Sequence, residues 1–387
     1  MKNVLFITQD KYPNGDAGAV RTHAFAKMFQ AMGYEPTVVG MGNTTNFEMK
    51  KEDGISFVSF RFPESNLISR VKGRLLYHKH LVRMMFQDKS SWDAIVLVSS
   101  TKKTLDFLKR YCKKHAVPLL HDSVEWYSPE QFRFGKLHSV YIKKDRWNRI
   151  HIDKDVRVIS ISTYLQEYFQ NKGVRTDRVP VIMDMKEMAH NKCVDREKVV
   201  FVYAGAPGKK DYLHVVVRGF AEMPGSAPYE LRLIGVTREQ LVNQCGVDPV
   251  CIEKLGEHLC CMGRIPREQV LEELSRADFT VLMRSQQQRY AKAGFPTKFV
   301  ESLATATPVI ANNTSDLGLY LKNGENGFVA EGESADALAD ALSQAMALSY
   351  EERIAMQHAA RKTAESYFDY RSYVKIVEAL LEEEHRE

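Results

Sequence analysis

The sequence has no long apolar run and few cysteines. No stretch of its 387 residues reaches the roughly 18–20 apolar residues that a membrane-spanning helix needs. The six cysteines form no C-x-x-C pair, the spacing typical of zinc sites and redox motifs. The first apolar run, Val4–Ile7, is too short for the core of a signal peptide. We therefore expect reduced thiols and a cytoplasmic location, with the inner face of the membrane as the nearest alternative.

Several nucleotide and nucleic-acid motifs are also missing. No G-x-G-x-x-G follows an expected strand, which argues against a dinucleotide site, and no G-x-x-x-x-G-K-[ST] is present, which excludes a P-loop. No internal repeat of about 20–50 residues is found. Basic residues are not interleaved with aromatic ones in a known module, so we expect no nucleic-acid partner.

The charge is divided unevenly along the chain. Residues 1–190 hold 31 Lys and Arg against 20 Asp and Glu, whereas residues 191–387 hold 23 against 29. A basic half and an acidic half indicate two domains with different partners. The basic half is suited to an anionic surface or an anionic substrate.

Strand-like apolar runs alternate with helical patterns throughout. DAIVLVSS at 93–100 precedes the helical pattern TKKTLDFLKRYCKKH, and KVVFVYAG at 198–205 restarts the alternation after a polar stretch. Repeated βα units predict an α/β fold with parallel sheets covered by helices. The length and the restart predict two such domains, connected near residues 183–198.

Two strand-to-helix turns carry glycines. The first, NGDAGAVRTH at 14–23, contains Gly15 and Gly18, and the second, YAGAPGKKDY at 203–212, contains Gly205, Lys209 and Lys210. Glycine allows close approach of the backbone to a ligand, and a helix start offers N–H groups to phosphate. The alternatives are a plain tight turn in each case and a solvated lysine pair in the second.

A third helix start is expected at GFPTKFVE, residues 294–301. Gly294 and Phe295 precede the helix, Thr297 and Lys298 begin it, and Glu301 lies on the same face as Lys298. A diphosphate at the helix start and a ribose held by Glu301 would match a nucleotide diphosphate. The alternative is an exposed Lys–Glu pair, which contributes only a few tenths of a kcal/mol.

These stretches resemble a known family. GFPTKFVESLATATPVIANN…NGENGFV and FVYAGAPGKKDYLHVVVRGFAEM…YELRLIGV resemble the donor-site region of family 4 glycosyltransferases with the GT-B fold, and HDSVEWYS at 121–128 is similar to an acceptor-side segment. The resemblance implies two Rossmann-like, doubly wound domains facing across a cleft. The acceptor-binding domain would span residues 1–190 and the donor-binding domain residues 191–367, with a helix at 368–387 returning to the first domain.

The resemblance also implies roles for individual residues. Glu301 matches the glutamate that holds the donor ribose, and Lys210 matches a lysine that meets the diphosphate. Gly294 and Phe295 match backbone positions against the donor, and Lys298 matches the lysine of the P-[ST]-K variant.

Three positions depart from the family pattern. A first glutamate would fall at Ala293, an arginine at Ala206 and a glycine at Ala306. The missing arginine puts the cationic clamp on the diphosphate in doubt, and Arg284 or Lys298 is expected to replace it.

The activity implied is retaining transfer of a sugar from a nucleotide-diphosphate sugar to a hydroxyl of a glycan or lipid-linked acceptor. It would need no metal and no cofactor besides the donor, and would serve cell-surface polysaccharide or glycoconjugate synthesis. His121, Asp122 and Glu125 are the candidates for acceptor positioning or proton removal; a structurally satisfied histidine is the alternative for His121.

The segment 66–89 contains six Lys and Arg among apolar residues and is a candidate contact with an anionic membrane, or else an ordinary surface helix.

Two other functions stay open. One is a catalytically degenerate GT-B subunit that binds glycan or a partner glycosyltransferase, and a weaker one is a sugar-nucleotide epimerase.

Overall fold

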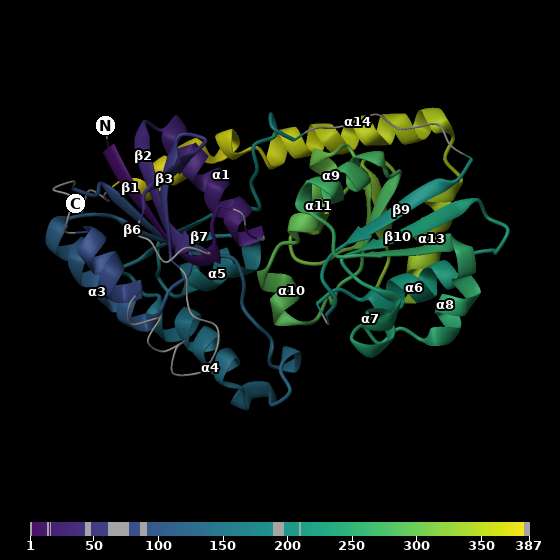
Figure 1. The fold of residues 1–387 in the computed structure, drawn as a ribbon, viewed down its shortest axis with the longest axis horizontal. Coiled ribbons are helices and arrows are strands. Elements are labelled where there is room, and N and C mark those ends of the chain that lie inside the picture. Colours follow the sequence, from purple (N-terminus) through teal and green to yellow (C-terminus); the bar gives the residue numbers. More distant parts are fainter. Residues whose placement is uncertain are drawn as a thin grey trace. The chain divides into compact units, whose positions relative to one another are not determined.

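The computed structural model describes residues 2–13, 15, 17–42, 48–60, 77–85, 91–188, 197–208 and 210–382. The chain divides into two compact units (Figure 1). Unit 1 comprises Met1–Glu125, Ile142–Met183 and Tyr370–Glu387, and unit 2 comprises Trp126–Tyr141 and Asp184–Asp369. Each unit contains one largely parallel sheet, which confirms the predicted α/β fold class.

The sheet of unit 1 has eight strands in the order β3-β4-β2-β1-β5-β6-β7-β8. All neighbouring pairs are parallel except β3 with β4. The residues Val4–Ile7 of β1 are fully buried, because helices cover both faces of a parallel sheet. The strands are β1 (Lys2–Lys11), β2 (Tyr34–Met41), β3 (Lys50–Glu52), β4 (Ile55–Phe60), β5 (Ala94–Leu97), β6 (Leu119–Ser123), β7 (Arg157–Ser160) and β8 (Thr176–Arg178).

Helices of unit 1 come from both ends of the chain. Val377 and Leu380 of the C-terminal helix are buried in the same core as β1 and the first helix. The helices are α1 (Ala17–Ala31), α3 (Lys102–His115), the π-helix η3 (Trp147–His151), α5 (Thr163–Asn171), η5 (Tyr370–Tyr373) and α15 (Val374–Leu381). Helix α4 (Ser139–Arg146) joins residues of both units.

The sheet of unit 2 has six parallel strands in the order β11-β10-β9-β12-β13-β14. They are β9 (Val199–Ala204), β10 (Tyr229–Ile234), β11 (Leu259–Gly263), β12 (Phe279–Leu282), β13 (Val309–Asn312) and β14 (Gly327–Ala330). Chain order reverses between β9 and β12, and ligands of doubly wound folds bind at the carboxyl ends of strands at such a point.

The helices of unit 2 begin at clear sequence signals. Ser349 and Glu352 form a capping box at the start of α14 (Tyr350–Tyr367), the longest helix in the described part of the chain. The others are η1 (Pro129–Gln131), η2 (Gly135–Leu137), α6 (Leu213–Ala221), α7 (Arg238–Asn243), α8 (Pro249–Leu255), η4 (Gly256–His258), α9 (Arg267–Arg276), α10 (Arg289–Ala293), α11 (Thr297–Ala304), α12 (Leu317–Tyr320) and α13 (Ala335–Met346). Among the described helices of both units, none is long and apolar enough to cross a bilayer.

The units differ from the predicted domains at residues 126–141. The prediction assigned them to the first domain, 1–190, but they belong to unit 2. The reason is a set of long-range hydrogen bonds. Arg289 donates to the carbonyl of Tyr127 at 3.1 and 2.5 Å, and the N–H of Tyr290 donates to Ser128 Oγ at 3.0 Å. We call residues 126–141 the strap.

Candidate functional site

A buried carboxylate gathers cations at the strand reversal of unit 2. Asp211 accepts hydrogen bonds from Arg284 Nε at 2.8 Å, from Tyr203 Oη at 2.8 Å and from Lys298 Nζ. Lys298 Nζ also donates to Tyr203 Oη at 3.0 Å. The side chains of Asp211 and Arg284 are 8% and 13% exposed, and that of Lys298 is 30% exposed. The site therefore holds two cations on one carboxylate, with a net positive charge.

The ionisation of this cluster follows from its geometry. Burial alone would raise the pKa of Asp211, but the charges of Lys298 and Arg284 and the hydrogen bonds from Lys298 and Tyr203 lower it below its usual value. Burial and the adjacent carboxylate raise the pKa of Tyr203 well above its usual value, so the phenol stays neutral and donates. Burial lowers the pKa of Lys298, although Asp211 opposes this shift.

Strand ends hold the members of the cluster in place. Tyr203 is near the end of β9, and Arg284 lies just beyond β12, where it forms an antiparallel bridge with Asp211. The buried amide of Asn312, the last residue of β13, accepts from the N–H of Arg284 at 3.0 Å and donates to its carbonyl at 2.7 Å. Arg284 is thus fixed at both its backbone and its guanidinium group.

Gly205 leaves space for the ammonium of Lys298. A Cβ at position 205 would lie 2.2 Å from Lys298 Nζ and 2.6 Å from Tyr203 Oη. The neighbouring turn at Gly235 is equally tight, because a Cβ there would lie 2.4 Å from the carbonyl of Gly205. The prediction that the turn after β9 needs glycine for close approach is consistent with this packing, although the group that approaches is a side chain of the protein itself.

The predicted helix start at residues 294–301 is present. Helix α11 begins at Thr297 with Pro296 as its N-cap, so the first-turn amides of Thr297 and Lys298 have no carbonyl four residues earlier within the helix. Gly294 precedes this turn. The ring of Phe295 is buried against Phe299, Tyr320 and Phe368, which leaves its backbone rather than its ring for a ligand.

Glu301 lies one turn along α11 and does not pair with Lys298. Its carboxylate accepts from Arg267 Nη1 at the start of α9 and is 13% exposed, whereas Arg267 is 42% exposed. The alternative of an exposed Lys298–Glu301 ion pair is therefore wrong, because each side chain has another partner. A carboxylate oriented by one guanidinium still has lone pairs for two neighbouring hydroxyl groups.

The second predicted lysine pair is only partly described. Lys209 lies outside the described residues. The ammonium of Lys210 lies 5.3 Å from the centre of the Tyr127 ring, and its carbonyl accepts from Tyr290 Oη at 2.8 Å. The strap and α10 thus border the turn that was predicted to meet a diphosphate.

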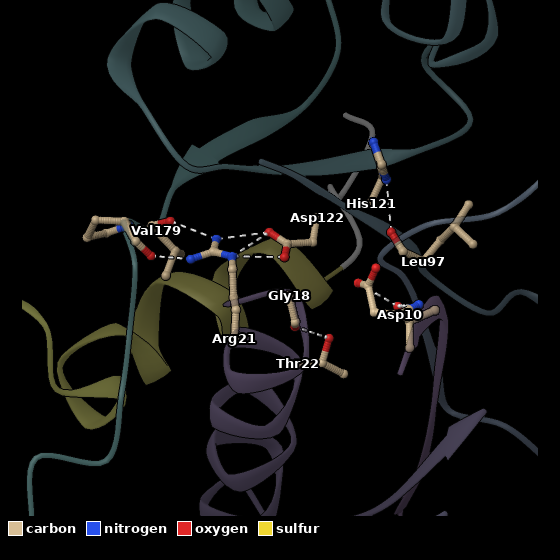
Figure 2. A network of polar contacts seen from close by, with 10 residues as sticks. Asp10, Gly18, Arg21, Thr22, Leu97, His121, Asp122 and Val179 are labelled. Atoms are coloured by element: carbon tan, nitrogen blue, oxygen red, sulfur yellow. Dashed lines mark hydrogen bonds and ion pairs between the residues drawn. The ribbon is translucent and has the colours of Figure 1, made fainter. Parts of the chain in front are cut away.

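In unit 1 the glycine turn leads into α1. A Cβ at Gly15 would lie 2.1 Å from the carbonyl of Lys11, so no side chain fits there. Gly18 is in the first turn of α1, and its carbonyl accepts from Thr22 Oγ1 at 2.9 Å (Figure 2). The chain folds tightly between β1 and α1, which is also the outcome expected of a plain turn.

Asp122 forms a buried ion pair with Arg21 of α1, as Figure 2 shows. Arg21 Nε donates to both carboxylate oxygens at 2.9 and 3.2 Å, and Nη2 donates to Oδ1 at 2.9 Å. Arg21 also donates to the carbonyls of Val179 and Pro180. Since the two side chains are 0% and 6% exposed, Asp122 anchors α1 to β6 and the 179–180 segment, which corrects its predicted contact with an acceptor.

His121 is packed and hydrogen-bonded at both ring nitrogens. Nδ1 lies 2.9 Å from the carbonyl of Leu97, and Nε2 accepts from Trp147 Nε1 at 3.1 Å. Burial lowers the pKa of His121 to about 4. A neutral ring whose accepting nitrogen already has a donor is a poor base, so these contacts favour the alternative of a structurally satisfied histidine. Glu125, 30% exposed and 3.8 Å from Lys144 Nζ, keeps its candidacy.

Sequence reasoning missed Tyr203, Asp211 and Arg267 in unit 2 and Arg21 in unit 1. Asp211 had a local signal. It directly follows two lysines at an expected anion site, where a carboxylate would repel the anion, so its presence indicates a structural role. Arg21 had none, since its partner is 101 positions away. In the part of the chain that the structure describes, no group of three His, Cys, Asp or Glu side chains is arranged to hold a metal ion.

Comparisons with known proteins agree on the fold. Residues 185–363 match the family model of glycosyl transferases group 1. Over 129 residues the chain is 33% identical to D-inositol 3-phosphate glycosyltransferase of Corynebacterium urealyticum, a match that covers 30% of this chain and only 29% of that relative.

Solved structures match along the whole chain. Sucrose-phosphate synthase from Thermosynechococcus elongatus superposes with a TM-score of 0.76 at 14% identity, covering 98% of each chain. Anabaena Alr3699/HepE in complex with UDP-glucose gives 0.68 at 16% identity, covering 98% of this chain and 100% of that one. WaaG, a glycosyltransferase involved in lipopolysaccharide biosynthesis, gives 0.67 at 14% identity, covering 98% and 99%. The fold expected from the sequence resemblance is thereby confirmed: the chain has the GT-B fold of these glycosyltransferases, and its residues 185–363 match the model of glycosyl transferases group 1.

Proposed function

We propose that the protein is a retaining glycosyltransferase that moves a sugar from a nucleotide-diphosphate sugar to a hydroxyl of a glycan or lipid-linked acceptor. Its setting would be cell-surface polysaccharide or glycoconjugate synthesis. The observation that carries the proposal is the cluster of Lys298 and Arg284 on Asp211, at the strand reversal of unit 2 and beside the start of α11. Alr3699/HepE, which shares the fold, has been solved with UDP-glucose.

The cluster supplies the electrostatics that the reaction needs. As the bond from the sugar to the diphosphate breaks, negative charge builds on the leaving phosphate. Lys298, Arg284 and the first-turn amides of α11 stabilise that charge from fixed positions. Asp211 does not contact the sugar in this proposal; it holds the two cations in place before the donor arrives.

Glu301 binds the donor ribose in this proposal. Its carboxylate accepts from the two ribose hydroxyls while Arg267 fixes its orientation. The helix start then contacts the diphosphate and Glu301 contacts the ribose, so the protein recognises two separate parts of the nucleotide. Retention follows from same-face attack assisted by the leaving phosphate, with no protein nucleophile and no metal.

The acceptor side is proposed on fewer residues. Glu125 is the candidate for orienting the acceptor hydroxyl, since His121 and Asp122 have structural partners. The proposed membrane contact through residues 66–89 falls largely outside the described residues, which include only 77–85 of it, a helical stretch.

The test is a thermal-shift screen against UDP-, GDP-, dTDP- and ADP-sugars, because a bound donor stabilises the folded state by mass action. The variants are Lys298→Ala and Glu301→Ala, with the exposed Lys254→Ala of α8 as matched control. We expect Lys298→Ala to weaken binding of both UDP and pyrophosphate by about 10–100-fold, and Glu301→Ala to weaken only UDP.

Turnover separates the two functional candidates. Release of UDP that depends on an acceptor supports the transferase. Binding of UDP-sugar without release under any acceptor identifies a catalytically degenerate subunit. Equal affinity of wild type and Lys298→Ala for pyrophosphate contradicts the assignment of the cluster as the diphosphate site.

A further inference from the structure

The strap contains a turn that exposes large apolar side chains among cations. Phe134 is 65% exposed and Leu137 84% exposed, and Val140 on α4 is 43% exposed. Five of the eleven large apolar side chains exposed in the described residues lie between 134 and 150. Scattered exposed apolar residues are ordinary, but this concentration in one continuous stretch is not.

Two short turns produce this exposure. The N–H of Gly135 donates to the carbonyl of Phe132 at 3.0 Å, and the N–H of Leu137 donates to the carbonyl of Phe134 at 3.0 Å. Phe132 faces inward, with its ring 5.6 Å from that of Tyr127 and 4.6 Å from that of His138. With the inner face filled by aromatic rings, Phe134 and Leu137 are left on the outer face.

Cations surround the exposed side chains. Between residues 130 and 150 the chain has six Lys and Arg against two Asp and Glu, a net charge of +4. Lys143 lies three residues after Val140 on α4 and so shares its face of the helix. The basic–apolar surface is defined by exposed Arg133, Phe134, Lys136, Leu137, Val140 and Lys143.

We infer that the basic–apolar surface binds an anionic lipid membrane. Phenylalanine and leucine side chains enter the region below the headgroups, while lysine and arginine extend toward lipid phosphates and keep their apolar stems beside them. A second copy of the chain fits poorly, since two such surfaces would bring like charges together. A stable protein interface also fits poorly, because lysine is depleted from interface cores.

The inference goes beyond the proposed function and does not depend on it. Vesicle binding requires neither donor nor turnover, so a protein that lacks transferase activity would still test the surface. If both hold, the contact places the enzyme where a lipid-linked acceptor is embedded.

The experiment is co-sedimentation of the full chain with phosphatidylcholine vesicles made with and without phosphatidylglycerol. We expect binding only to the anionic vesicles. Phe134→Ser/Leu137→Ser should reduce the partition coefficient by about tenfold or more. Lys136→Gln/Lys143→Gln should reduce it by about fivefold for each charge removed and weaken its dependence on salt.

The matched control is Val250→Ser/Leu319→Ser, which removes two apolar side chains that are 66% and 52% exposed elsewhere. It should bind as the wild type does. The inference is overturned if wild type does not bind anionic vesicles, or if Phe134→Ser/Leu137→Ser binds as well as wild type. It is also overturned if that variant instead abolishes self-association or capture of an acidic protein, which would assign the surface to a protein partner.

Discussion

Replacing Asp211 with asparagine tests whether the carboxylate holds the cation cluster together. Asparagine keeps the shape of the side chain and an oxygen that accepts from Tyr203, but it removes the negative charge. Lys298 and Arg284 would then repel each other in a site where Asp211 and Arg284 are 8% and 13% exposed. The variant therefore isolates charge from packing.

The expected cost can be worked from the geometry. Arg284 Nε and Asp211 Oδ1 are 2.8 Å apart, so their attraction is about 6 kcal/mol at an effective dielectric constant of about 20, before desolvation. Removing one partner from a buried ion pair costs about 3–5 kcal/mol. Since Lys298 is 30% exposed and partly screened, we expect the lower end, about 3 kcal/mol.

Calorimetry at pH 7 measures this cost. A loss of about 3 kcal/mol lowers the Tm of a unit of this size by about 6–12 °C. Asp340→Asn, which removes an exposed carboxylate from α13, should leave Tm unchanged. If Asp211→Asn melts with the control, the carboxylate does not organise the cations, and the electrostatic account of the site is wrong.

The pH dependence gives a second, independent reading. The folded pKa of Asp211 lies below 3.8, its ordinary value, so its contribution is present above pH 3.8 and lost as the pH falls toward the folded pKa. The difference in stability between wild type and Asp211→Asn should therefore be constant from pH 5 to 7 and shrink in acid. A difference that grows on acidification would contradict the sign of the shift.

Three further predictions concern stability and proton binding. Arg21→Met should destabilise unit 1 by about 3–5 kcal/mol in chemical denaturation, because it leaves Asp122 buried without its cation, and the double variant with Asp122→Leu should recover part of the loss. The pKa of His121 is lower in the folded protein than in the unfolded chain, so His121 should contribute a loss of about 3 kcal/mol as the pH falls from 6.5 to about 4. His121→Gln should flatten the dependence of stability on pH by that amount, and an unchanged slope would contradict the burial of a neutral ring. Ala306 has φ +59°, a conformation that costs an L-residue about 1 kcal/mol, so Ala306→Gly should raise the free energy of unfolding by up to about 1 kcal/mol, whereas Ala304→Gly inside α11 should lower it.

Local patterns in the sequence predicted the elements of the fold but not the pairing of charges. Apolar runs such as VLFI gave buried parallel strands, and the order Gly294, Pro296, Lys298 gave a helix start with a cation in its first turn. Ala306 occupies the position where the family has glycine, and its positive φ explains that preference. These features depend on neighbours within a few residues, where propensity and periodicity act.

Features that depend on distant partners were not predictable. An exposed Lys298–Glu301 pair was the alternative that the helix spacing offered, but the ammonium of Lys298 instead donates to Asp211, 87 positions away. The strap was assigned to the wrong unit because its anchors, Arg289 and Tyr290, are 162 positions from their partners. A single sequence carries no signal for such contacts. Only such contacts distinguish a structural role of His121 from a catalytic one.

In the proposed diphosphate site, the carboxylate of Asp211 between two cations has a physical justification. Without Asp211, two cations would be partly desolvated and mutually repelled in the empty protein, and they would move apart or become disordered. With Asp211 present, the two cations are held in fixed positions before a ligand binds. Each keeps N–H groups that do not donate to the carboxylate. The net charge is then smaller, so a ground-state diphosphate gains less attraction than two unopposed cations would give. In the proposed reaction, fixed donors favour the species whose charge is largest, which would be the departing diphosphate. The arrangement would then give up affinity for the bound donor and retain selectivity for the transition state.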